Sequence, residues 1–288
     1  MKLSQTRVAL ALLLVILATT SGCGVVNRIR AKNALNEGAR AYRDGQFPLA
    51  QEKFEYALSL DPDQKNAPVF LARAIQQQYR PGVDTGENVA KANAAIEAYK
   101  KVMENPNIDE KTKEDAYNAV AYMYRQMRDE NKERDWLMQR ANLESAPKDK
   151  RSDAYTVLSS KEWNCSYEIT EQKENKQTVQ RPDSVTIQYK MPANREDFEK
   201  ARQCALKGLE LAEKAISLNP DNPNAWSYKT NLLREMAKMA QMDNKPDDKT
   251  NYDKQADEAE ATQKRLNEEA ARRKEAEEAQ KSPTPPAS

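Results

Sequence analysis

Histidine is absent from this sequence of 288 residues, and glycine and phenylalanine are scarce, with seven and four copies. Histidine is the commonest general base of enzymes and the commonest zinc ligand, so its absence argues against the most frequent catalytic and metal sites. Scarce glycine, beside abundant alanine, lysine, glutamate and glutamine, favours helix along the chain. The composition therefore argues against an enzyme domain built on a β-sheet.

Cysteine and excess charge are also lacking. The three cysteines, Cys23, Cys165 and Cys204, lie too far apart in the sequence to predict a thiolate metal site. Lysine and arginine number 46 against 45 aspartates and glutamates, so nothing in the charge favours nucleic acid. Neither a glycine-rich phosphate loop nor a dinucleotide-binding pattern occurs. We therefore expect no cofactor, no metal, no nucleic-acid partner and no catalytic residue.

Residues 31–64 contain the unit that organises the rest of the chain. Small or aromatic residues fall on one face of each of two expected helices, which a turn at residues 44–46 separates. These residues are Ala34, Gly38, Ala41, Ala50, Phe54 and Ala57. The small side chains let two antiparallel helices approach while Phe54 fills the space between them, and Pro62 ends the second helix.

This pattern resembles a tetratricopeptide repeat (TPR), with Ala34 where the family often has tryptophan and Glu37 where it has leucine. Such repeats bury their apolar faces only by stacking, so the resemblance implies further copies. Later copies occur from Lys65, near Glu114, around Tyr155 and from Pro223. We predict an all-α, TPR-like helical solenoid of about five helix-turn-helix repeats over residues 31–245. The alternative, an ordinary hairpin of a helical bundle, explains the apolar faces but not the copies.

The fourth copy is interrupted at about residues 164–192 by a pattern of period two. The alternating apolar residues are Cys165, Tyr167 and Ile169, then Val185, Ile187 and Tyr189. Period two in β-branched and aromatic residues is typical of half-buried strands, so we predict an inserted β-hairpin. An isolated hairpin is marginally stable in water, so one of its faces should lie against the helices.

The end of the chain is strongly charged. Residues 246–281 carry acidic and basic side chains four residues apart, such as Glu268 and Arg272, which support a solvated helix. No apolar heptad is sustained there, so we predict a capping helix rather than one strand of a coiled coil. Residues 282–288, of sequence SPTPPAS, are predicted to form a disordered tail.

Residues 1–22 have the pattern of a secretory signal peptide. Lys2 and Arg7 precede an apolar run at residues 8–18, which is too short for a transmembrane helix of about twenty residues. The small residues before Cys23 resemble the lipobox of bacterial lipoproteins, with Thr20 where that family usually has leucine. The alternative is an ordinary cleaved signal followed by an incidental cysteine.

The lipoprotein resemblance implies a location. Cys23 would be acylated, for example with palmitate, and would become the N-terminus of the mature protein, with residues 23–30 as a lipidated tether. The protein would then be anchored to a membrane of the cell envelope and face the periplasm. Gly24, rather than aspartate, follows the cysteine, which slightly favours the outer membrane.

The TPR resemblance also implies a function. Such repeats bind peptides in a groove lined by first-helix side chains, which in the first copy are Lys32, Leu35, Ala39 and Tyr42. The family's dicarboxylate clamp needs lysine and asparagine where this chain has Leu35 and Ala39, so binding of chaperone tails is disfavoured. We predict a non-catalytic scaffold for an unidentified envelope protein or peptide. The rival hypothesis is an enzyme or ligand-binding protein with a site between the hairpin and the groove.

Cys165 and Cys204 remain available once Cys23 carries lipid. An oxidising compartment permits one bridge between them, which would fasten the insertion to its own repeat. Closing a loop of this length stabilises by roughly 4 kcal/mol in the chain-entropy model. Bridged residues need α-carbons about 4.4–6.8 Å apart. The alternative is that both are small buried thiols on separate faces.

Overall fold

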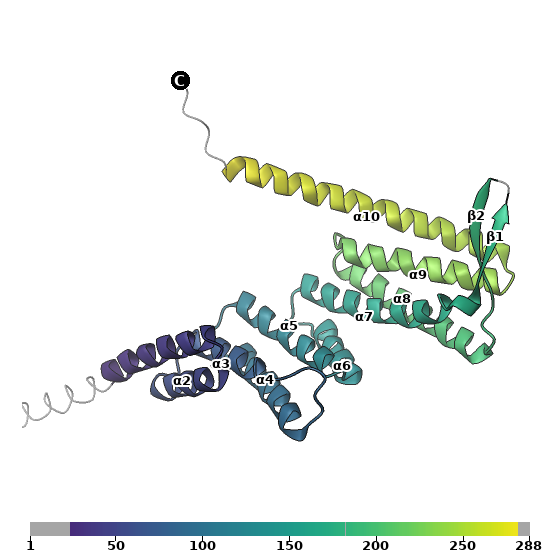
Figure 1. Ribbon diagram of the computed structural model, residues 1–288. Helices are drawn as coiled ribbons and strands as arrows, with labels where there is room; N and C mark the ends of the chain where they lie inside the picture. The colour runs from purple at the N-terminus through teal and green to yellow at the C-terminus, as the bar shows by residue number, and fades with distance from the viewer. Residues whose placement is uncertain (1–23, 182, 282–288) are drawn as a thin grey trace, which may run out of the picture. The chain divides into compact units, whose positions relative to one another are not determined.

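The computed structural model describes residues 24–181 and 183–281 (Figure 1). By its internal contacts the chain divides into two compact units, Met1–Glu133 and Arg134–Ser288. Helical hairpins build both units, and a two-stranded antiparallel sheet is inserted in the second. The predicted fold class is therefore confirmed: all-α, with TPR-like helical hairpins, an inserted β-hairpin and a long charged last helix.

The first unit begins with a helix over residues 24–43, within the described part of the chain. The helices that come after it are α2 (Phe47–Leu60), α3 (Ala67–Gln76), α4 (Gly86–Glu104) and α5 (Glu110–Gln126). Thr85 and Asp109 cap α4 and α5, because each side chain accepts a hydrogen bond from a backbone N–H three residues on. Residues 24–30, which we expected to be a tether, are helical.

The first hairpin closes on Phe54, whose side chain is fully buried against Ala41, Ala50 and Ala74. A Cβ added to Gly38 would lie 2.6 Å from Cε1 of this ring, closer than real contacts permit. Position 38 must therefore be glycine for the two helices to approach this closely, as the repeat pattern predicts.

The same three-residue turn occurs at three places in residues 24–181 and 183–281. Its middle residue has a positive φ, which is 74° at Gly45, 56° at Arg128 and 56° at Asn244. The amide of the next residue donates to the carbonyl five residues back, as Gln46 to Ala41, Asp129 to Tyr124 and Lys245 to Ala240. The third of these turns leads into residues 246–281, which therefore begin as the second helix of a hairpin with the helix before the turn.

The second unit has longer helices than the first. They are α7 (Lys148–Thr170), α8 (Arg195–Leu218), α9 (Pro223–Met242) and α10 (Pro246–Lys281), while α6 (Glu130–Asn142) spans the division between the units. Small residues let α7 and α8 pack closely. Ser152 Oγ donates to the Ala215 carbonyl at 2.8 Å, and Ser159 Oγ donates to the Gly208 carbonyl at 2.9 Å. Serine hydroxyls of α7 thus donate hydrogen bonds to backbone carbonyls of α8 where the two helices pack together.

The first predicted strand is wrong. Cys165, Tyr167 and Ile169 belong to α7, and the β-hairpin consists of β1 (Lys176–Arg181) and β2 (Ser184–Tyr189). Ile169 packs among the buried side chains around Phe198 of α8, so burial against a neighbouring helix decides the conformation of this segment. An alternating run of five residues does not exclude a helix, and tertiary packing overrides local preference.

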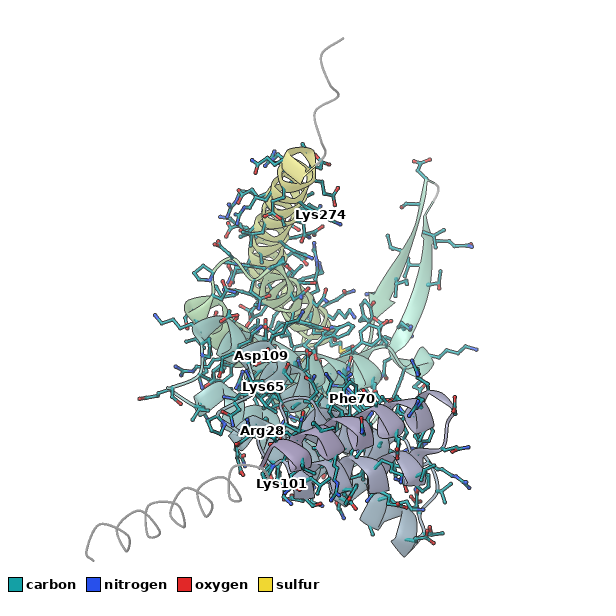
Figure 2. The ribbon with its side chains drawn as sticks, turned by 90° about the vertical axis from the view of Figure 1, so that its left-hand side faces the viewer. Arg28, Lys65, Phe70, Lys101, Asp109 and Lys274 are labelled. Atoms are coloured by element: carbon teal, nitrogen blue, oxygen red, sulfur yellow. A yellow bond between two sulfur atoms is a disulfide. The ribbon has the colours of Figure 1, made fainter. Side chains whose placement is uncertain are left out.

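The expected packing of one hairpin face against the helices is also wrong. Val185 is 67% exposed and Ile187 is 55% exposed, whereas Asn175 at the base of the hairpin is buried. Figure 2 shows the hairpin standing out from the helices of its unit, with side chains projecting from it. The helices hold only the base of the hairpin.

The last helix has two parts. Ala256 and Ala259 of α10 pack on Leu233 of α9, and Leu266 is also buried. Residues 270–280 are all exposed. The first half of α10 is thus a packed partner of α9, and the solvated character that we predicted applies to the second half. The predicted disordered tail, residues 282–288, lies outside the described part of the chain.

Candidate protein-binding surfaces

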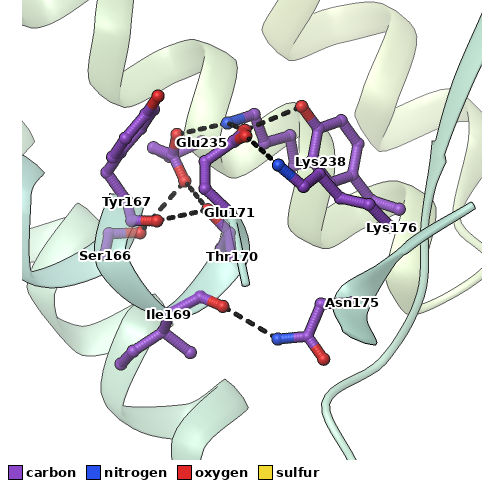
Figure 3. Close-up of polar contacts among 10 residues, drawn as sticks. Ser166, Tyr167, Ile169, Thr170, Glu171, Asn175, Lys176, Glu235 and Lys238 are labelled. Carbon is purple, nitrogen blue, oxygen red and sulfur yellow. Dashed lines mark hydrogen bonds and ion pairs between the residues drawn. The ribbon is translucent and has the colours of Figure 1, made fainter. Parts of the chain in front are cut away.

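Polar side chains from α7, the hairpin and α9 meet where the hairpin joins the helices (Figure 3). They are Ser166, Thr170, Glu171, Lys176, Tyr189, Glu235 and Lys238. We call this group the hairpin-base cluster. It adjoins the hairpin, which the rival hypothesis makes one side of its site, so its chemistry bears on that hypothesis.

Glu171 is the centre of the hairpin-base cluster. Lys238 Nζ lies 2.6 Å from Glu171 Oε1, Lys176 Nζ lies 2.9 Å from Oε2, and the Tyr189 hydroxyl donates to Oε1 at 2.8 Å. Burial alone would raise the pKa of Glu171, but the hydrogen bonds from these three residues outweigh burial and lower it to about 2. Glu171 is therefore ionised at neutral pH.

Lys238 joins Glu171 to a second carboxylate. Its Nζ lies 2.7 Å from Glu235 Oε1, and Glu235 Oε2 accepts from the Thr170 hydroxyl at 2.6 Å. Burial would lower the pKa of Lys238, but the charge of Glu235 and the hydrogen bonds to both carboxylates raise it. A general acid or base works best with a pKa near 7, so this Lys238–Glu171 pair is suited to holding the hairpin and not to proton transfer.

A hollow of about 590 Å³ lies beside the cluster, between the hairpin, α9 and α10. Its cationic side chains already have partners. Arg234 Nη2 lies 2.8 Å from Asp257 Oδ1, and Lys249 Nζ lies 2.5 Å from Asp253 Oδ2. The hollow therefore offers an anionic ligand no uncompensated cation from these side chains.

A second hollow, of about 490 Å³, lies in the first unit among α2, α3 and α4. We call it the α2–α4 hollow. Its apolar lining comprises Leu58, Pro62, Pro68, Leu71, Ile75, Ala94 and Ala98. Its polar lining comprises Gln51, Glu55, Glu97, Lys101 and Asn105. An apolar surface with a few polar groups around it is the usual character of a binding pocket.

The four groove residues predicted from the sequence lie on the helix over residues 24–43, and none of them lines this hollow. Lys32 is exposed, whereas Leu35, Ala39 and Tyr42 are partly buried. Leu35 packs with Ala34 and Ala57, and the Tyr42 ring meets the Phe47 ring edge-on at 5.4 Å. Leu35 and Tyr42 thus contribute to the packing of the first hairpin.

Sequence reasoning missed the α2–α4 hollow. The available signal was a set of apolar residues that the repeat pattern does not require, among them Leu58 of α2 and Ala94 and Ala98 of α4. Ala94 is exposed and Ala98 is partly exposed, although neighbouring Ala95 is buried. Apolar residues beside a hollow but outside the core are candidates for contact with a partner.

Cys165 and Cys204 are joined by a disulfide, with their α-carbons 6.0 Å apart. The bond lies on the seam between α7 and α8, close to Glu162. Glu162 Oε1 lies 2.5 Å from Arg134 Nη1 and 3.0 Å from Lys207 Nζ. The bridge thus fastens the end of α7, from which the hairpin emerges, to the helix that comes after the hairpin.

The start of the described chain exposes apolar side chains. Val25 is 59% exposed, Val26 is 46% exposed and Ile29 is 58% exposed, with Arg28 and Arg30 beside them. Cys23 itself lies outside the described residues. Among residues 24–181 and 183–281, no helix combines the length and the apolarity needed to cross a bilayer.

Comparison with known proteins gives likenesses of structure only. No family model and no curated protein matches the chain. A crystal structure of the MamA protein is similar, with 16% identity, 82% of this chain and 94% of that chain covered, and a TM-score of 0.38. MamA 41-end from Desulfovibrio magneticus RS-1 has 14% identity, covers 81% and 97%, and has a TM-score of 0.35.

The TPR2AB-domain:pHSP90 complex of yeast Sti1 is a third similar structure. It has 14% identity, covers 81% of this chain and 98% of that chain, and has a TM-score of 0.33. Whole-chain superposition is poor at these scores. The assignment of the helical hairpins therefore rests on this chain's own residues, above all Gly38, Phe54 and the recurring turns.

Proposed function

We propose that this chain is a non-catalytic scaffold that binds another protein of the bacterial envelope and is held on a membrane by lipid on Cys23. The observation that carries the binding role is the α2–α4 hollow, an apolar surface between helices of successive hairpins. This hollow lies on the second helices α2 and α4 and not in the first-helix groove of the repeat family, so its binding role rests on its exposed apolar lining.

The occupant of the α2–α4 hollow is an amphipathic helical segment of the partner. The volume of about 490 Å³ suits a few apolar side chains and not a folded domain. A helix laid in a groove presents such side chains at intervals of three and four residues. In the polar lining Glu97 is already paired with Lys100 at 2.8 Å. Glu55 accepts from Gln51 at 2.8 Å, so the apolar lining and not charge would select the segment.

Membrane attachment is supported by the residues directly after Cys23. Val25, Val26 and Ile29 expose apolar side chains within two helical turns of the cysteine, and Arg28 and Arg30 carry positive charge there. Apolar side chains beside basic ones suit the surface of a membrane with anionic lipids. The proposed location is the cell envelope, facing the periplasm, with the outer membrane slightly favoured by Gly24.

The rival enzyme hypothesis is weakened by the hairpin-base cluster. Its central carboxylate, Glu171, has a pKa of about 2, and the pKa of Lys238 is raised. Side chains that are charged and bonded to one another at neutral pH position the hairpin. We therefore propose no catalytic residue and no cofactor.

Photo-crosslinking in intact envelopes tests the proposal. A photoreactive residue in place of Glu97, beside the hollow, should capture one envelope protein, whereas the same residue in place of exposed Arg272 on α10 should not. Capture from position 32 and not from position 97 would place the contact on the sequence-predicted face of Lys32, Leu35, Ala39 and Tyr42. Equal capture from 97 and 272 would contradict the proposed surface.

A further inference from the structure

The β-hairpin has unpaired backbone groups whose positions can be derived. The Lys190 N–H donates to the Asn175 carbonyl at 2.8 Å, and these residues lie directly beyond the Lys176–Tyr189 pair of the ladder. Hydrogen-bonded and non-hydrogen-bonded pairs alternate along an antiparallel ladder. The pair of Thr178 and Ile187 is therefore non-hydrogen-bonded, and the backbone groups of both residues point to opposite outer edges of the hairpin.

The two edges differ in their side chains. On β2, the residues whose backbone N–H and C=O groups point to the outer edge are Val185, Ile187 and Tyr189. On β1 they are Lys176, Thr178 and Gln180. The β2 sequence, SVTIQY, contains no charged residue and no proline, which are the devices by which proteins protect an edge strand. Val185 and Ile187 are also exposed. The edge of β2 is therefore the more favourable one for pairing with another strand.

The surroundings of β2 leave room for such a strand. The hollow of about 590 Å³ is lined on one side by four residues of β2 and one of β1, and on the other by α9 and α10. The strand residues are Thr186, Ile187, Gln188 and Tyr189 of β2 and Val179 of β1. This volume suits one short extended segment of polypeptide. Because its cations are already paired with carboxylates, recognition there would come from the backbone and from apolar contacts.

The hairpin is held in position before any partner arrives. Glu171 binds Lys176 of β1, Tyr189 of β2 and Lys238 of α9, so both strands are fixed to the helices at their base. The Cys165–Cys204 bridge fastens α7 to α8 on either side of the insertion. A fixed edge loses little conformational entropy on binding, which favours affinity.

We propose that β2 accepts an extended peptide segment of a partner protein as a third strand of the sheet. The N–H and C=O groups of Ile187 and its neighbours would bond to the peptide backbone, and alternate side chains of the peptide would cover Val185 and Ile187. The preferred segment is uncharged, with β-branched residues at every second position. This surface is separate from the α2–α4 hollow, so failure at one leaves the other standing.

The test uses the full chain in detergent and a defined probe. The probe is a blocked, uncharged nine-residue peptide in which valine alternates with glutamine. Its binding is followed by fluorescence anisotropy, and amide exchange of Ile187 is measured with and without it. The wild-type chain should bind the probe, and the Ile187 N–H should become protected from exchange.

Two proline variants form a matched pair, because Thr178 and Ile187 are cross-strand partners whose N–H groups face opposite edges. Ile187→Pro removes a donor from the β2 edge and should weaken binding about tenfold. Thr178→Pro removes the equivalent donor from the β1 edge and should leave the affinity within about threefold of wild type. Ile187→Thr retains the N–H and should also bind within about threefold of wild type.

Four results would overturn the proposal. They are no binding by the wild-type chain, equal binding by both proline variants, a loss confined to Thr178→Pro, and binding without protection of the Ile187 N–H. Analytical ultracentrifugation can give a fifth result that would overturn the proposal. If the chain dimerises through β2, and Ile187→Pro abolishes the dimer while the probe fails to compete, a second copy is the occupant instead.

Discussion

Lys238 Nζ lies 2.6 Å from Glu171 Oε1, and this ion pair joins α9 to the residue that caps the C-terminal end of α7, ahead of the β-hairpin. Glu171 also holds Lys176 and Tyr189, one from each strand. The ionised carboxylate of Glu171 thus ties both strands to α9, beside the bond from Asn175 Nδ2 to the Ile169 carbonyl.

Acid should therefore loosen the hairpin. The pKa of Glu171 is lowered from 4.5 to about 2, so its contribution to docking is complete above pH 4.5 and is lost as the pH falls toward 2. We expect amide exchange in β1 and β2, corrected for its intrinsic pH dependence, to accelerate across this range. Glu171→Gln should remove the pH dependence. An unchanged profile in that variant would assign the effect to another group.

Gly38→Ala should destabilise the first unit. The new Cβ would lie 2.6 Å from Cε1 of Phe54, whose buried ring cannot move aside freely. We expect a loss of roughly 1–3 kcal/mol, which outweighs the gain of up to about 1 kcal/mol in helix propensity. Urea unfolding measures it. Gly86→Ala is the control, because nothing lies within 4 Å of a Cβ at that position. Equal stability of both variants would contradict the close approach.

Removing the disulfide should destabilise the second unit. Cys204→Ser should lower the free energy of unfolding by roughly 2–4 kcal/mol, because the unfolded chain regains freedom. Urea unfolding with and without reductant measures this, and reduction should affect the wild-type chain but not the variant. Two free thiols titrated in oxidised Cys23→Ser protein would show that the bridge does not form.

Cys23→Ser should release the protein from the membrane or leave it unprocessed. Envelope fractionation and intact mass would detect the change, because the wild-type chain should carry acyl groups on Cys23. Val26→Ser and Ile29→Ser together should retain the lipid but weaken association with anionic vesicles, since their exposed side chains lie just after the anchor. Recovery of wild-type protein as a soluble, unacylated species would reject the anchor.

The first hairpin could be predicted because its determinants are local in sequence. Gly38, Phe54 and the turn at Gly45 lie within one repeat, and each has a steric reason for its position. The segment from Cys165 to Ile169 could not be assigned in the same way. Its alternation fits a strand, but burial of Ile169 beside Phe198 of α8 depends on residues far along the chain.

The candidate binding surface depended even more on tertiary structure. The α2–α4 hollow arises where Leu58 of α2 and Ala94 of α4, from successive hairpins, are placed around Leu71 of α3. The repeat pattern predicts which residues are buried, but it does not predict the distance between the second helices of successive hairpins, here α2 and α4. The sequence predicted a protein-binding scaffold, and the structure supplies the surface on which we now propose that it binds.

The central claim is best tested by the affinity of the purified chain for the protein captured at position 97. Ala94→Arg fills the α2–α4 hollow from an exposed position, and Asn93→Arg adds the same side chain to the next residue, which is exposed and outside the hollow lining. Titration calorimetry should show Ala94→Arg weakening binding at least about tenfold, with Asn93→Arg within about twofold of wild type. Equal affinities for both variants would contradict binding in the hollow.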